Sequence, residues 1–189
     1  INMIFAAAPS QNEVLWGLAT DREIPWNRVN AFHMDEYIGL PADAPQGFGN
    51  FLKEHIFGLA DFKEVFYIDI TAEDAEAECE HYAALLREYP TDIVVMGIGE
   101  NGHIAFNEPG TPFDSVTHVV ALAESTVKDN SRLFKSIDEV PRRAFTMGLA
   151  NIMAAKKVVI LANGANKARA VYGLCRGEIT EQLPASILQ

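Results

Sequence analysis

Short apolar runs alternate with stretches of helical periodicity along almost the whole chain. Apolar runs bounded by turn residues are typical of strands buried on both faces, and apolar residues three and four positions apart are typical of helices. The pattern predicts strands over residues 2–8, 29–34, 65–68, 93–96, 119–122, 144–147 and 158–162. It predicts helices over residues 10–18, 50–57, 71–89, 125–134, 149–154 and 167–176.

The clearest of these helices is expected to begin at Thr71. Asp74 follows three residues later and makes a near capping box, acidic residues crowd the first turns, and Pro90 ends the helix. Alternation of strands and helices predicts an α/β fold with a three-layer, doubly wound, mostly parallel sheet and helices on both faces. Ligands bind beyond the carboxyl ends of the strands in such sheets, so the loops after Met34, Met96 and Ala162 are the first to search.

The length of 189 residues fits a single domain over 1–189, without internal repeats or linkers. The chain begins at Ile1 within an apolar run and ends at Gln189 in mid-pattern, so we expect a segment truncated at both ends. No apolar run approaches the roughly 18 residues of a membrane span. Two cysteines, Cys79 and Cys175, are too few for a disulfide framework; we expect half-buried thiols in a reducing compartment, the cytoplasm.

Acidic residues number 26 against 15 basic ones, which gives a formal net charge of −11. Such a chain repels phosphate backbones and anionic lipid, so nucleic acid and membrane surfaces are poor partners. A small-molecule ligand is favoured, and a homo-oligomer is compatible with the sequence. Any anionic ligand must then be bound by locally placed cations.

The loop after Met96 begins with Gly97-Ile98-Gly99-Glu100-Asn101-Gly102, which matches the G-x-G-x-x-G dinucleotide pattern. A dinucleotide site needs a helix that starts within the glycines, and Pro109 and Pro112 forbid one of useful length. We therefore expect a tight active-site turn. It brings the imidazole of His103 beside Asn101, Glu100 and Glu108, where a carboxylate can orient a proton-transfer group. A metal site is the weaker hypothesis, because no second His or Cys lies at ligand spacing.

A second loop with candidate catalytic residues follows the strand ending at Met34, where Asp35 and Glu36 precede Gly39 and Pro41. Adjacent carboxylates in a rigid loop at the end of a strand suit a general base. The alternative is that Asp35 caps a turn and Glu36 is solvated.

Few cations are placed to bind an anion. Lys167 lies at the N-terminus of a predicted helix, where free backbone N–H groups favour binding of a phosphate. Arg132, which follows Asn130-Ser131, is the second candidate cation. Ser10 and Gln11 stand at the start of another predicted helix, and this N-terminus could donate hydrogen bonds to an anion. The alternative is that Ser10 simply caps the helix.

Together these motifs resemble the glucosamine-6-phosphate deaminase (isomerase) family, within a superfamily that includes 6-phosphogluconolactonase and ribose-5-phosphate isomerase. The resemblance rests on the stretches 34–41 and 102–110, which are similar to family signatures, and it extends over essentially the whole chain. Supporting similarity lies in residues 114–115, 130–132, 146–148 and 164–167.

The resemblance implies conversion of glucosamine 6-phosphate and water to fructose 6-phosphate and ammonia, with no cofactor and no metal. Asp35 matches the base that moves a proton between C2 and C1, and His103 matches the residue that assists ring opening. Glu108 and Asn101 complete the polar relay of hydrogen-bonding groups around His103. The substrate-binding residues are expected to be Ser10, Gln11, Gly102, Arg132 and Lys167, of which the last two match phosphate-binding cations.

The chain departs from the family pattern at three places. Asn101 stands where the relay commonly has Asp, and residues 10–14 replace a Thr-Gly-Gly-Thr-Pro-like phosphate turn. His118 and Val120 occupy positions that are basic in allosterically activated members of the family. We therefore expect this chain to lack an allosteric activator site. The alternatives are a deaminase for galactosamine 6-phosphate or a related phosphosugar, a 6-phosphogluconolactonase-like hydrolase, and a non-catalytic phosphosugar sensor.

Overall fold

The parallel part of the fold contains five strands. The computed structural model describes the backbone of residues 1–189 and the side chains of all of them except Ser125 and Asp129. The strand order is β4-β2-β1-β5-β8, and every pairing is parallel. The strands are β1 (Asn2–Phe5), β2 (Asn30–His33), β4 (Glu64–Phe66), β5 (Ile93–Met96) and β8 (Lys157–Ile160). All five were predicted, with boundaries that differ by a few residues.

A second, antiparallel sheet has the order β3-β7-β6, with β3 (Asp35–Tyr37), β6 (His118–Ala121) and β7 (Arg143–Thr146). The predicted strands at 119–122 and 144–147 therefore exist but do not join the parallel sheet, and β3 was not predicted as a strand. The chain passes from one sheet to the other at Met34. Its N–H donates to the carbonyl of Phe5 at 3.3 Å, and its carbonyl accepts from Met147 at 2.8 Å.

The helices are α1 (Asn12–Thr20), α2 (Phe48–Leu52), α3 (Ala75–Glu88), α4 (Glu124–Asn130), α5 (Leu149–Met153) and α6 (Ala168–Arg176). The predicted start of α3 at Thr71 is wrong, because Asp74 is its N-cap and accepts from Ala77 N–H at 3.0 Å. Thr71 instead hydrogen-bonds to Asp69 in the preceding turn. The helix expected to reach residue 134 ends at Asn130, and a one-turn helix, Ser131–Leu133, follows it.

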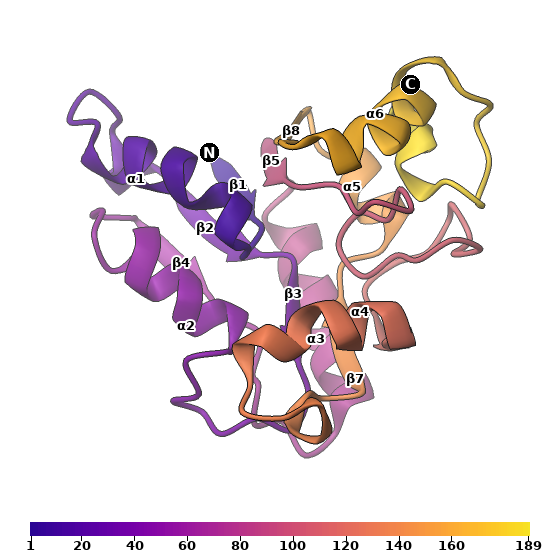
Figure 1. The fold of residues 1–189 in the computed structure, drawn as a ribbon. Coiled ribbons are helices and arrows are strands. Elements are labelled where there is room, and N and C mark those ends of the chain that lie inside the picture. Colours follow the sequence, from indigo (N-terminus) through magenta and orange to yellow (C-terminus); the bar gives the residue numbers. More distant parts are fainter.

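Both faces of the parallel sheet are covered, as the sequence predicted. Along β1, Phe5 packs in a cluster with Leu15 of α1 and Ile56, which lies just after α2. Its neighbour Ile4 points to the opposite face, into a cluster that contains Tyr82 of α3. Figure 1 shows α6 at the β8 end of this sheet, away from α1 and α2.

Both cysteines lie in helices, but neither is half-buried as expected: Cys79 on α3 is buried and Cys175 on α6 is exposed. Within the part of the chain that the structure describes, no helix is long and apolar enough to cross a membrane.

Candidate active site

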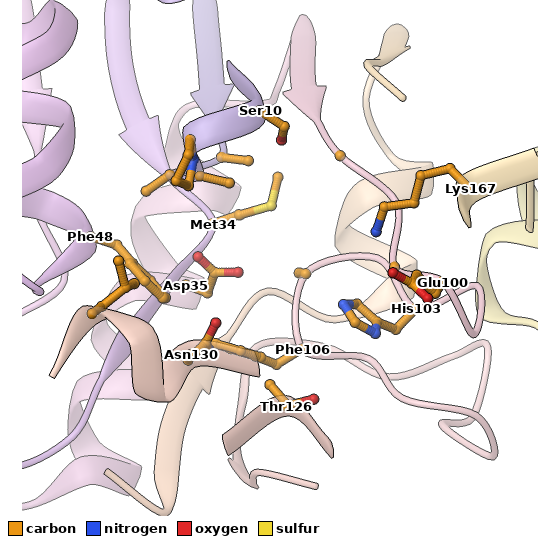
Figure 2. Close-up of a pocket in the computed structure, with 18 of the residues that line it drawn as sticks. Ser10, Met34, Asp35, Phe48, Glu100, His103, Phe106, Thr126, Asn130 and Lys167 are labelled. Atoms are coloured by element: carbon orange, nitrogen blue, oxygen red, sulfur yellow. The ribbon is translucent and has the colours of Figure 1, made fainter. Parts of the chain in front are cut away.

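A cavity of about 980 Å³ opens at the carboxyl ends of the parallel strands. The segments that follow β1, β2, β5 and β8 all contribute to its wall, together with α4 and the turn after it. The loops after Met34, Met96 and Ala162, which the sequence marked as the first to search, all line this cavity. Figure 2 shows Asp35, His103 and Lys167 directed from different segments toward the same space.

Asp35 lies where the two sheets meet. It is the first residue of β3, opposite Thr146 of β7, and it directly follows the crossover residue Met34. The residue is 8% exposed. Burial, and then the negative charge of the neighbouring Glu36, raise the pKa of Asp35 to about 8. A carboxylate so poorly solvated has the increased proton affinity expected of a general base.

The backbone of Asp35 is held by a buried histidine that sequence reasoning did not single out for this role. His33 Nε2 accepts from the N–H of Ile68 at 2.9 Å, so His33 Nδ1 carries the hydrogen donated to the carbonyl of Asp35 at 2.9 Å. The hydroxyl of Tyr82 donates to the His33 carbonyl at 2.8 Å and accepts from its N–H at 3.1 Å. Burial lowers the pKa of His33 to about 4, against the opposing effect of the bond to Asp35.

Glu36 is not solvated, so that alternative is wrong. The residue is 2% exposed, and its carboxylate accepts from three backbone N–H groups at 2.8–2.9 Å, those of Tyr37, Phe48 and Gly49. Burial raises the pKa of Glu36, and the three hydrogen bonds oppose that rise. Glu36 therefore joins β3 to the first turn of α2 and contributes negative charge beside Asp35.

The loop after β5 contains turns and an isolated bridge rather than the helix of a dinucleotide site. Two glycines make this conformation available. Gly102 has φ +85°, and a side chain at Gly99 would place its Cβ 2.3 Å from the imidazole of His103. Asn107 then anchors the loop to the second sheet, because its amide donates to the carbonyl of Met147 at 2.8 Å.

His103, Asn101 and Glu108 are brought together as predicted. The Oδ1 of Asn101 lies 2.7 Å from His103 Nδ1, and its Nδ2 donates to Glu108 Oε2 at 2.7 Å. Glu108 Oε2 is itself 3.6 Å from His103 Nδ1. Burial alone would raise the pKa of Glu108, but interactions with His103, Thr126 and Asn101 together lower it to about 2. Glu108 thus supplies the negative charge that an amide at position 101 cannot.

Both expected phosphate-binding cations line the cavity. Lys167 is the N-cap residue of α6, and Arg132 lies in the one-turn helix after α4. Sequence reasoning did not predict that Glu100 would hold the adjacent loop, where its carboxylate accepts from the amide of Asn166. This contact ties the loop of His103 to the loop that presents Lys167.

The remaining predicted binding residues differ in position. Ser10 lines the cavity and caps no helix, because it lies inside the short helical turn Pro9–Gln11, and the N-cap of α1 is Gln11. Gln11 is fully buried behind it, with Nε2 donating to Ser10 Oγ at 3.3 Å. Gly102 supports the turn and faces Leu183. Direct substrate contact by Gln11 or Gly102 stays a prediction.

The described residues contain no group of three His, Cys, Asp or Glu side chains placed to hold a metal ion. What the cavity does bring together is a desolvated carboxylate, an imidazole oriented by an amide and a carboxylate, and two cations. Such a set can move a proton between adjacent carbons of an anionic ligand and exchange protons with its oxygens.

Comparisons with known proteins agree with this chemistry. The model of the family described as glucosamine-6-phosphate isomerases/6-phosphogluconolactonase matches residues 9–189. The glucosamine-6-phosphate deaminase of Lactobacillus delbrueckii subsp. bulgaricus is 50% identical over 167 residues, which are 88% of this chain and 71% of that protein. The Lactobacillus helveticus enzyme of that name is 45% identical over 183 residues, 97% of this chain and 77% of that protein.

Solved structures extend the similarity to three dimensions. A monomeric glucosamine-6-phosphate deaminase superposes with a TM-score of 0.92 at 39% identity, covering 99% of this chain and 80% of that one. A 6-phosphogluconolactonase from Thermotoga maritima gives a TM-score of 0.79 at 23% identity, covering 100% of this chain and 80% of that one. The second likeness shows a shared fold with a mostly parallel sheet.

Proposed function

Because the chain belongs to the family of glucosamine-6-phosphate isomerases and 6-phosphogluconolactonases, we propose that it converts glucosamine 6-phosphate and water into fructose 6-phosphate and ammonia. One observation carries the proposal. The Asp35 carboxylate, with its raised pKa, faces across one cavity toward an imidazole oriented by Asn101 and Glu108. Aldose–ketose isomerisation needs such a pair, a base for a C–H proton and a second group for the sugar oxygens.

The first step is opening of the pyranose ring. His103 Nδ1 faces Asn101 Oδ1, an acceptor, which leaves Nε2 to take the proton of the O1 hydroxyl and return it to the ring oxygen. Glu108 lies 3.6 Å from Nδ1 and stabilises the imidazolium formed in between. The amide of Asn101 orients the imidazole of His103 without taking up the proton.

The second step is proton transfer along the open chain. Asp35 removes the proton from C2, the electron pair forms a C1–C2 double bond, and the aldehyde oxygen takes the proton that His103 has accepted from the substrate's ammonium group. Asp35 then returns the proton to C1, so that C2 becomes the carbon of an iminium ion. Water adds to C2 and passes one proton to the amine, ammonia leaves, and loss of the remaining hydroxyl proton to His103 forms the ketone. Arg132, Lys167 and Ser10 hold the phosphate group during these steps.

An ammonia-release assay tests the proposal. The protein is given glucosamine 6-phosphate, galactosamine 6-phosphate and glucosamine, and hydrolysis of 6-phosphogluconolactone is measured in parallel. We expect ammonia from glucosamine 6-phosphate at the highest kcat/KM, and release slower by on the order of 10²- to 10⁴-fold from the Asp35→Asn variant. Preferential lactone hydrolysis would replace the proposal with the hydrolase alternative. Tight phosphosugar binding without turnover would replace it with the sensor alternative.

We further propose that the enzyme works in the cytoplasm. Cys79 and Cys175 are free thiols, in agreement with a reducing compartment. The proposed catalytic and phosphate-binding groups all line one cavity of a single chain, so we expect activity to be independent of a homo-oligomer. Light scattering at assay concentration, compared with activity on dilution, tests this independence.

A further inference from the structure

The carboxylate of Glu108 is held from two sides by different parts of the chain. Its Oε2 interacts with Asn101 and His103 on its own loop. Its Oε1 accepts the hydroxyl of Thr126, on α4, at 2.6 Å. An O–H···O⁻ bond of this length is typical of a charge-assisted hydrogen bond. Thr126 is only 7% exposed, so the bond is largely shielded from water.

The helix that carries Thr126 also leads to one of the phosphate-binding cations. α4 ends at Asn130 and runs directly into the one-turn helix that contains Arg132. Thr126, Asn130 and Arg132 all line the cavity, and Figure 2 shows the first two near Asp35 and His103. The far end of this segment is tied separately, because the amide of Gln46 donates to the carbonyl of Leu133 at 3.1 Å.

We propose that Thr126 is a positioning residue that couples phosphate binding at Arg132 to the orientation of Glu108, and through Glu108 to His103. The inference rests on the proposed function, which assigns the phosphate to Arg132 and proton transfer to His103. A phosphate bound by Arg132 holds α4 in the position at which Thr126 reaches Glu108. By reciprocity, an intact bond between Thr126 and Glu108 presents Arg132 to the phosphate.

Two substitutions separate the hydroxyl from the shape of the side chain. Thr126→Val keeps the branched shape and removes the donor, whereas Thr126→Ser keeps the donor and removes a methyl group. We expect kcat to fall on the order of tenfold in Thr126→Val, the size typical for loss of one hydrogen bond to a charged group, and to stay within about twofold in Thr126→Ser. A residue that acted only by packing would give the opposite order and overturn the proposal.

A double-mutant cycle on kcat tests the coupling, with Lys167 as the matched control. Arg132 and Lys167 both line the cavity, but only Arg132 lies on the segment attached to Thr126. We expect Arg132→Ala to lower kcat in the native background and to lower it little further in Thr126→Val. We expect Lys167→Ala to have the same effect in both backgrounds. Independent effects of Arg132→Ala and Thr126→Val would overturn the coupling.

A binding measurement separates failure of this inference from failure of the proposed function. Calorimetry with glucitol 6-phosphate, an open-chain phosphosugar without an aldehyde or an amine, needs no turnover. We expect the Kd to rise several-fold in Thr126→Val and in Glu108→Gln, to rise no further when the two are combined, and to be native in Thr126→Ser. Native Kd values in all variants would overturn the coupling, whereas absence of ammonia release by the native protein would overturn only the function.

Discussion

The two sides of the cavity are built in opposite ways. On the side of the base, Asp35, His33 and Glu36 are at most 8% exposed and are held by bonds between β2, β3, α2 and α3. On the side of the phosphate, Arg132 is exposed and Lys167 is half-buried, and both belong to one-turn helices at the start or end of longer ones.

This difference separates two requirements of the proposed reaction. A base that takes a proton from carbon gains from poor solvation and a fixed direction, and burial provides both at a cost in stability. Cations that attract a dianion need only approach it, and they remain useful in a more solvated setting. The groups whose pKa follows the direction set by burial accordingly lie on the buried side, at Asp35, Glu36 and His33.

The largest effect is expected at the centre of the buried side. Asp35→Asn should lower kcat on the order of 10²- to 10⁴-fold, because the amide cannot accept the C2 proton. Binding of glucitol 6-phosphate, measured by calorimetry, should change little. Turnover near the native rate would contradict the assignment of Asp35 as the base.

The same substitution should stabilise the protein at alkaline pH. The pKa of Asp35 is raised from 3.8 to about 8, so the native protein retains a proton there that the unfolded chain has lost. Stability is therefore lost progressively as pH rises from about 4 through about 8. The melting temperature of Asp35→Asn relative to the native protein should rise over this interval and level off above it. A constant difference would mean that Asp35 is not desolvated.

Much of the fold follows from local pattern, and the partners of the strands do not. The run at 93–96 predicts a buried strand because all of its residues are apolar. Nothing local shows that Phe145 pairs with Val119 and Glu36 in a second sheet, because pairing depends on distant segments. β3 was missed because a single residue, Met34, separates it from β2, and no Gly or Pro marks the break.

The candidate site divides in a similar way. Asp35, Asn101, His103 and Glu108 lie in loops rich in titratable groups and turn residues, which makes them visible in the sequence. Thr126 and Tyr82 act through single hydroxyl groups within helices, where nothing in the local pattern distinguishes them. Burial of Glu36 had a weak signal, since Met34 and Tyr37 flank the acidic pair with side chains suited to a core.

The next largest effect concerns His33. Its pKa is lowered from 6.5 to about 4, so the unfolded chain binds a proton more readily than the native protein. Stability from this group is complete above pH 6.5 and is lost as pH falls through about 4, by up to about 3 kcal/mol. In His33→Gln, urea unfolding should show a weaker loss of stability between pH 6.5 and 4.

A smaller effect is expected at Glu36. Glu36→Gln replaces one accepting oxygen by a donor, so at least one of three buried N–H groups loses its partner, at a cost of about 2 kcal/mol. The substitution also removes negative charge beside Asp35 and lowers the pKa of the base. The acidic limb of kcat/KM should therefore move to lower pH. Glu80→Gln, on the exposed face of α3, should change neither property.

The smallest effect is expected on the solvated side. Lys167→Ala removes one phosphate-binding cation without altering the groups that transfer protons, so KM should rise on the order of tenfold while kcat stays within about twofold. The increase should shrink at high salt, because a half-buried charge is partly screened. Lys157→Ala, on β8 outside the cavity, serves as the matched control and should leave KM unchanged. An unchanged KM in Lys167→Ala would place the phosphate elsewhere and would remove the contrast between the two sides of the cavity.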